Sequence, residues 1–168
     1  MTEVVFVSDD RRYGLRIPAE NMSLILKLCA QARPNETGGI LAGLYTPDLD
    51  SAVVLAVHGP PPDSVQGRRH FIRGTQGLQR WLDELWDQKR QYYLGEWHYH
   101  PDASPAISSV DQEQMEGISR EGTWRCPEPV LLIIGGNSRS QWSVKAYAFP
   151  GVNVEMRKMV CSGVNQRR

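Results

Sequence analysis

A short uninterrupted apolar run, Val130–Ile134, limits the folds that are open to this chain. It is far shorter than the roughly 20 apolar residues that cross a bilayer, and a run of this length is typical of a buried strand. Helical periodicity is found elsewhere, because apolar residues recur every three or four positions from Ala19 to Ala32 and again from Thr75 to Gln91. We therefore expect helices packed on a sheet, with no membrane partner.

The remaining periodic segments are short and mostly alternate apolar with polar residues, as half-buried strands do. A third helix is expected from Ser108 or Ser109 to about Arg120, where a Ser-x-x-acid pattern marks a helix start. The further strands are predicted at Val4–Val7, Tyr13–Ile17, Thr37–Tyr45, Ala52–Val57, Arg69–Arg73, Tyr92–Tyr99 and Trp142–Phe149.

Length and charge restrict the class of protein further. The 168 residues suit one domain, which we expect to cover residues 1–160, followed by a loose polar tail at 161–168. Lys plus Arg is 19 and Asp plus Glu is 19, so the net charge is zero and the basic field that non-specific nucleic-acid binding requires is missing. No nucleic-acid partner is therefore expected.

The cysteines and the first residues favour a cytoplasmic protein. Cys29, Cys126 and Cys161 are widely spaced and odd in number, so they predict neither a disulfide framework nor a thiolate zinc site. Cys29 lies between Leu28 and Ala30 on the first expected helix, where we expect a small buried hydrophobic residue rather than a nucleophile. The first residues lack the basic and apolar segments of a signal peptide.

The segment Gly95–Pro101 carries the most informative chemistry. His98 and His100 are separated by one residue on an expected strand, so both imidazoles point to one face, roughly 7 Å apart, and can reach one cation. Asp111 follows eleven residues after His100, in the first turn of the third helix. Two nitrogen ligands and one carboxylate leave a fourth tetrahedral position open to water, as in catalytic zinc sites.

Each part of this pattern also has a purely structural interpretation. Ser108 and Asp111 fit an ordinary capping box, and two histidines can share an exposed strand face without binding anything. The combination favours the metal site. His58 and His70 have no partner at ligand spacing and are expected to be surface or loop residues.

With these residues the chain resembles the JAB/JAMM (MPN-domain) zinc metallopeptidases. Their signature is an upstream Glu, then His-x-His-Pro, seven residues, and Ser-x-x-Asp, which His98, His100, Ser108 and Asp111 match. The family's upstream Glu lies in a Glu-x-x-Gly-x-Leu-x-Gly strand, and Glu36 begins the matching segment here. The resemblance covers roughly residues 19–149 and implies an α/β (α+β) fold, a mixed curved sheet packed by three helices in a cytidine-deaminase-like arrangement.

The resemblance also implies a role for each site residue. One catalytic Zn²⁺ is held by His98, His100 and Asp111 and lowers the pKa of its water to about 7. Glu36 is the expected acid/base, and Ser108 the expected hydrogen-bond donor to the developing oxyanion.

Two neighbouring positions qualify this assignment. Glu96 competes with Glu36, because it shares the strand parity of the histidines and could be a fourth ligand or a neighbour at the strand base; the resemblance favours Glu36. Tyr99 stands where many members have Ser or Thr. It is not a ligand, but it could alter the shape beside the metal.

Members of this family mostly cut after the C-terminal glycine of ubiquitin or a ubiquitin-like modifier. The compact domain and the Gly-Glu-Trp-His form of the motif resemble bacterial members found beside ubiquitin-like conjugation genes, including those of CBASS antiphage systems. The resemblance thus implies an isopeptidase that releases a modifier or a conjugated nucleotidyltransferase, with E1/E2-like enzymes encoded nearby. The segments Gly59–Arg68 and Gly135–Gln141 are the expected sites of substrate contact.

Three other functions remain open at this point. They are a peptidase that trims a sulfur-carrier or other β-grasp protein, a metal-free scaffold that only binds partners, and a DNA-repair-associated member with the same motif. The complete ligand set argues against the scaffold, and the neutral charge argues against the DNA-associated member.

Overall fold

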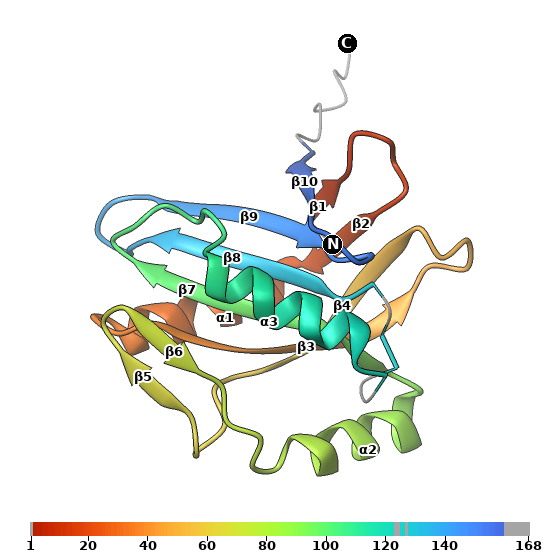
Figure 1. Ribbon diagram of the computed structural model, residues 1–168, viewed down its shortest axis with the longest axis horizontal. Coiled ribbons are helices and arrows are strands. Elements are labelled where there is room, and N and C mark those ends of the chain that lie inside the picture. The colour runs from red at the N-terminus through yellow and green to blue at the C-terminus, as the bar shows by residue number, and fades with distance from the viewer. Residues whose placement is uncertain (1, 123–124, 127, 160–168) are drawn as a thin grey trace, which may run out of the picture.

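A computed structural model describes residues 2–122, 125–126 and 128–159 (Figure 1). The single domain of residues 1–160 stays a prediction, and the predicted tail at 161–168 lies outside the described residues. The elements are β1 (Glu3–Val7), β2 (Gly14–Pro18), α1 (Ala19–Ala32), β3 (Thr37–Tyr45), β4 (Ser51–His58), β5 (Val65–Gly67), β6 (His70–Ile72), α2 (Leu78–Lys89), β7 (Tyr92–Pro101), α3 (Ser109–Arg120), β8 (Val130–Gly136), β9 (Trp142–Ala148) and β10 (Val154–Lys158).

Eight of these strands form one mixed sheet in the order β1-β10-β9-β8-β7-β3-β4-β2, with β2 pairing back to β1. The β7–β8 and β2–β4 pairs are parallel, and the others are antiparallel. β5 and β6 form a separate two-stranded hairpin. The expected α/β fold with three helices and a mixed curved sheet is confirmed, and β10, which the sequence did not predict, closes the sheet by pairing with β1.

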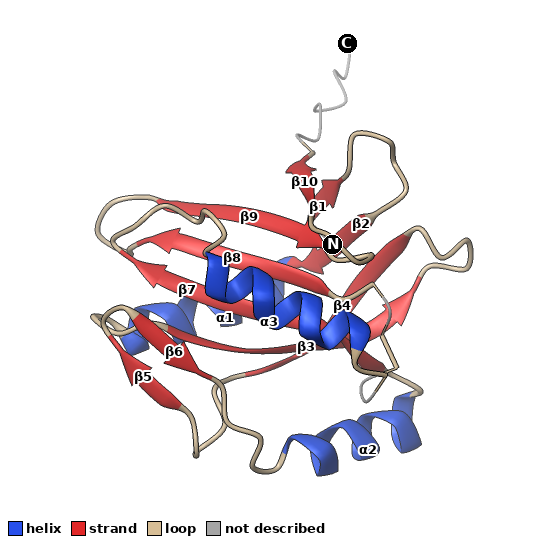
Figure 2. Cartoon of the chain, in the orientation of Figure 1, coloured by secondary structure: helices blue, strands red, loops and turns tan. Residues whose placement is uncertain are grey.

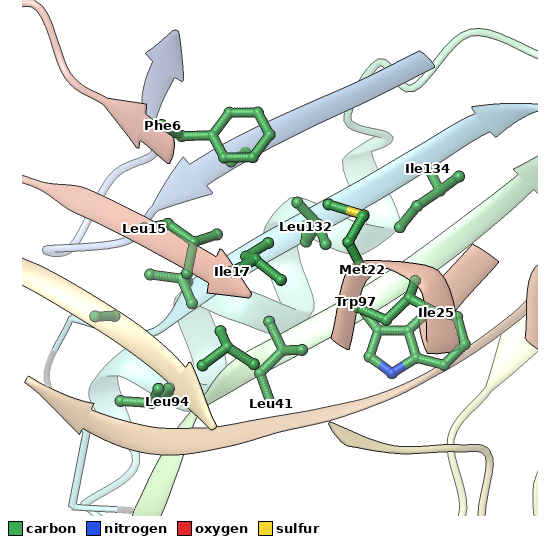
Figure 3. Close-up of a cluster of buried hydrophobic side chains, with 14 of the residues drawn as sticks. Phe6, Leu15, Ile17, Met22, Ile25, Leu41, Leu94, Trp97, Leu132 and Ile134 are labelled. Atoms are coloured by element: carbon green, nitrogen blue, oxygen red, sulfur yellow. The ribbon is translucent and has the colours of Figure 1, made fainter. Parts of the chain in front are cut away.

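The two faces of the sheet bury different side chains, which explains the run Val130–Ile134. Leu132 and Ile134 point into the enclosed core, where α1 contributes Met22 and Ile25 (Figure 3). Leu131 and Ile133 point to the opposite face and pack in a second cluster with residues of α2 and α3. Figure 2 shows α3 lying across β8 and β7, and α1 on the other side of the sheet. Because β8 is covered on both faces, its successive side chains are all apolar instead of alternating with polar ones.

The helices confirm the predicted periodicity with small differences at their ends. α2 begins at Leu78 rather than at Thr75, because Gly77 before it has a left-handed φ of 82°, and it ends where Arg90 adopts a φ of 56°. Cys29 is fully buried, as expected, and burial raises the pKa of its thiol to about 12. Among the described residues, no helix combines the length and apolar character needed to cross a membrane.

Candidate active site

Three chain segments meet at one side of the molecule: the end of β7, the start of β3 and the first turn of α3 (Figure 1). On β7, Trp97 and Tyr99 belong to the enclosed core, and the alternation of the strand turns His98 and His100 towards α3. Gly38 on β3 lies opposite His98, and a β-carbon there would come within 2.9 Å of His98 Cδ2. Glycine at this position therefore leaves room for the imidazole.

Asp111 joins the two histidines. Its Oδ1 lies 2.7 Å from His98 Nδ1, and its Oδ2 lies 3.5 Å from His100 Nε2. All three side chains are largely buried, so their mutual electrostatic interactions are only weakly screened by water. The three side chains therefore lie together in the structure, as their spacing predicts, and their roles stay a prediction.

The capping box is also present, so its structural interpretation holds alongside the functional one. Asp111 N donates to Ser108 Oγ at 3.1 Å, and the Ser108 backbone N–H donates to Asp111 Oδ2 at 3.0 Å. The Ser108 hydroxyl donates to the same oxygen at 2.6 Å. The start of α3 thus fixes the carboxylate that both imidazoles contact.

The electrostatics of this cluster favour a positive charge at its centre. Burial alone lowers the pKa of His98, but hydrogen bonding to Asp111 and the nearby Glu96 carboxylate outweigh it and raise the pKa to about 9. Burial alone raises the pKa of Asp111, but hydrogen bonds from His100, His98 and Ser108 hold it well below its usual value.

Glu36 lies immediately before β3, and its backbone N–H donates to Gly67 O at the end of β5 with an N···O distance of 2.8 Å. Its carboxyl group is half-buried beside His100 and Asp111. Burial is the main reason that its pKa is raised, and the nearby imidazoles partly offset this effect. A carboxylate with a raised pKa is better suited to accept and return a proton near neutral pH.

One cavity of about 670 Å³ holds the predicted site residues Glu36, His98, His100, Ser108 and Asp111. Its wall includes the β5–β6 hairpin, through Arg68 at the end of the first expected substrate segment and through four residues that the sequence analysis did not assign to the site: Arg69, His70, Phe71 and Ile72. His70 is exposed, as expected, but it lies on β6 and lines this wall. A second cavity of about 770 Å³, between α2 and β7, contains none of the predicted site residues.

The two expected substrate segments differ in position. The first, Gly59–Arg68, contributes Arg68 to the cavity wall and forms β5 of the hairpin. In the second, Gly135–Gln141, no residue is among those that line the cavity. Tyr99 has a fully buried side chain whose hydroxyl donates to Gly136 O at 3.0 Å, so its ring packs in the core on the opposite face of β7 from the imidazoles.

Glu96, the alternative acid/base, is fully buried and is paired with Arg73. Arg73 Nε and Nη2 lie 3.0 and 2.9 Å from Glu96 Oε1. Gln114 Nε2 donates to the other oxygen, Oε2, at 3.3 Å, and that oxygen lies 3.6 Å from His98 Nε2. Burial alone raises the pKa of Glu96, but His98 and Arg73 outweigh burial and lower it. Of the two alternatives that the sequence left open for Glu96, this geometry fits a neighbour of the site at the base of the strand rather than a fourth metal ligand.

His98, His100 and Asp111 are of the ligand types that hold a catalytic zinc. Within the described part of the chain, no three His, Cys, Asp or Glu side chains are already spaced around a common cation position, and His98 and Asp111 hydrogen-bond to each other directly. His98 Nε2 is nevertheless buried and has no hydrogen-bond partner among the described residues, which leaves it available as a ligand. The residue types and the local charge therefore fit a cation.

Known proteins are similar to this chain in sequence and in fold. The chain is 36% identical to the "CD-NTase/cGAS isopeptidase" of Enterobacter hormaechei over 92% of its length and 86% of the relative's. It is 27% identical to a probable metalloprotease of Sinorhizobium fredii, over 71% of the chain and 74% of the relative. A solution structure of a Desulfitobacterium hafniense protein superposes with a TM-score of 0.56 at 21% identity, covering 86% of this chain and 90% of that one, and shares the fold.

The match to a family model covers most of the domain. Residues 18–146 match the model described as prokaryotic homologs of the JAB domain, a range that includes Glu36, both histidines and Asp111. Together with the relative at 36% identity, this match shows that the chain belongs to the prokaryotic JAB-domain family.

Proposed function

We propose that the protein is a zinc-dependent isopeptidase that cleaves after the C-terminal residue of a conjugated protein and so reverses conjugation. The observation that carries the proposal is the meeting of Glu36, His98, His100 and Asp111 in one cavity. The similarity to a relative named as a CD-NTase/cGAS isopeptidase supports a conjugated nucleotidyltransferase as the substrate, ahead of a ubiquitin-like modifier. An antiphage role in the cytoplasm, with E1/E2-like enzymes encoded nearby, is part of the same proposal.

The residues of the chain divide the reaction between them. His98, His100 and Asp111 would hold the zinc, which would supply a Lewis acid for the scissile carbonyl and the attacking water. Glu36 accepts the proton of that water and returns it to the leaving amine, so that a carboxylate is formed and a lysine side chain or a short peptide is released.

Ser108 connects positioning and catalysis. Its hydroxyl donates to Asp111 in the structure and therefore orients that carboxylate. Ser108 is exposed and lines the cavity, so its hydroxyl can rotate towards a bound substrate. We propose that it then donates a hydrogen bond to the developing oxyanion.

The position of the hairpin supports recognition of an extended tail. β5 and β6 pair with no other strand among those described, so the outer edge of β6 is available to another strand, whereas Gly67 O at the end of β5 already accepts from the Glu36 backbone N–H. A substrate tail that adds to such an edge can bring its last carbonyl to the imidazoles, and small residues such as glycine allow the closest approach. We propose that the rest of the folded partner contacts the segments around this hairpin.

Zinc content provides the first test. We expect about one equivalent in the purified wild type and its loss in His98→Ala, His100→Ala and Asp111→Ala, because each variant keeps only two of the three protein ligands. Elemental analysis measures this directly, and His58→Ala, which changes a histidine outside the site cavity, is the matched control. Less than half an equivalent in the wild type, or full occupancy in all three ligand variants, is incompatible with the proposed site.

A further inference from the structure

The tip of the β5–β6 hairpin places a concentrated positive charge on the wall of the active-site cavity. Arg68 and Arg69 form the turn between β5 and β6, and His70 follows them as the first residue of β6. All three line the cavity, and all three are exposed. The charge therefore faces the space that a substrate enters.

Neither of these two arginines has an ionic partner among the described residues. Six of the eleven other arginines in the described part of the chain pair with carboxylates, namely Arg16, Arg33, Arg73, Arg80, Arg120 and Arg157. Two adjacent guanidinium groups without a counter-ion repel each other, and a carboxylate placed between them relieves that repulsion. Arginine is also the side chain that binds a carboxylate through two parallel hydrogen bonds.

The acidic side chains that line the cavity, Glu36 and Asp111, do not serve as counter-ions to Arg68 and Arg69. Asp111 is held by both imidazoles and by Ser108. Glu36 interacts with His100, Asp111 and His98, and its backbone holds the hairpin at Gly67. The positive charge at the hairpin tip is therefore available to an anion brought by the substrate.

We propose that Arg68 and Arg69 determine specificity by binding acidic side chains on the substrate segment that flanks the scissile bond. The inference rests on the proposed function, since it places the substrate tail beside this hairpin. The recognised feature is a carboxylate-bearing peptide, and the contact is electrostatic and lies at the rim, so it acts on encounter and binding rather than on the chemical step.

Binding can be measured separately from cleavage. The probes are two fluorescein-labelled hexapeptides, Gly-Asp-Glu-Leu-Gly-Gly and Gly-Asn-Gln-Leu-Gly-Gly, titrated with the zinc-loaded Glu36→Gln protein and followed by fluorescence anisotropy. We expect the acidic peptide to bind about tenfold more tightly at low salt, because each of two exposed ion pairs at the rim increases the affinity a few-fold. The preference shrinks as salt is raised, because solvent-exposed charges are screened.

Matched variants locate the effect. Arg68→Gln combined with Arg69→Gln is expected to remove the preference for the acidic peptide, whereas Lys89→Gln combined with Lys158→Gln, which removes the same charge outside the cavity lining, is expected to keep it. All four side chains are exposed, so thermal unfolding of both double variants should match that of the parent. Equal binding of the two peptides by the parent protein, no binding of either peptide, or equal effects of the two double variants would overturn the inference. An acidic preference without hydrolysis of any conjugate would refute the isopeptidase proposal and leave this binding site supported.

Discussion

Replacing Glu36 by glutamine is expected to lower the rate of hydrolysis by about 10²- to 10⁴-fold, the usual contribution of a general acid/base. The amide has nearly the same shape but cannot accept the proton of the attacking water. Because Glu36 is not among the proposed zinc ligands, the variant should retain its metal. Single-turnover cleavage of a fusion substrate, together with elemental analysis, measures both effects.

Two further carboxylates serve as comparisons. Glu113→Gln changes an exposed carboxylate on α3 outside the cavity lining and should cleave at the wild-type rate. Glu96→Gln changes the buried neighbour of His98 that is paired with Arg73. An inactive Glu96→Gln variant beside an active Glu36→Gln variant would reverse the assignment of the acid/base.

The second large effect concerns stability. Arg73→Met is expected to lower the free energy of unfolding by about 3–5 kcal/mol, because it leaves the fully buried Glu96 carboxylate without its arginine partner. Urea denaturation followed by circular dichroism measures the loss. Arg80→Met is the matched control, since Arg80 forms an exposed ion pair with Glu84 and should change stability little.

The double variant Arg73→Met/Glu96→Leu separates the loss of the ion pair from the burial of an unpaired charge. It should be more stable than Arg73→Met alone, because it no longer buries an unpaired carboxylate. If Arg73→Met proves no more harmful than Arg80→Met, the buried pair does not anchor the segment after β6 to β7.

The parts of the site that follow from local spacing could be predicted from the sequence. Strand alternation places His98 and His100 on one face, and the capping box fixes Asp111 in the first turn of α3. The approach of Glu36 follows from the pairing of β3 with β7, which strand periodicity alone does not specify. It was expected only because the surrounding residues resemble a known motif.

The parts that depend on long-range contacts were missed. Arg73 is a lone cation next to a short strand, and nothing nearby in the sequence indicates that its partner is Glu96, 23 residues later. β5 is three residues long, too short for a periodic pattern to stand out. β10 buries only Met156 among its five residues, and it is ordered by pairing with β1 and β9. Whether such short segments form strands depends on pairing with neighbouring strands more than on their own residues.

We propose above all that the protein cuts immediately after the C-terminal residue of a folded, conjugated partner. The most direct test incubates the wild type and Glu36→Gln with a nucleotidyltransferase of the CD-NTase class that carries a C-terminal fusion, and locates the cut by intact mass. The account predicts one product that ends at the nucleotidyltransferase's own C-terminal residue, formed by the wild type and at least about 100-fold more slowly by the variant. A cut far inside the partner, or equal cleavage of the unfolded partner, would contradict it and identify a general peptidase.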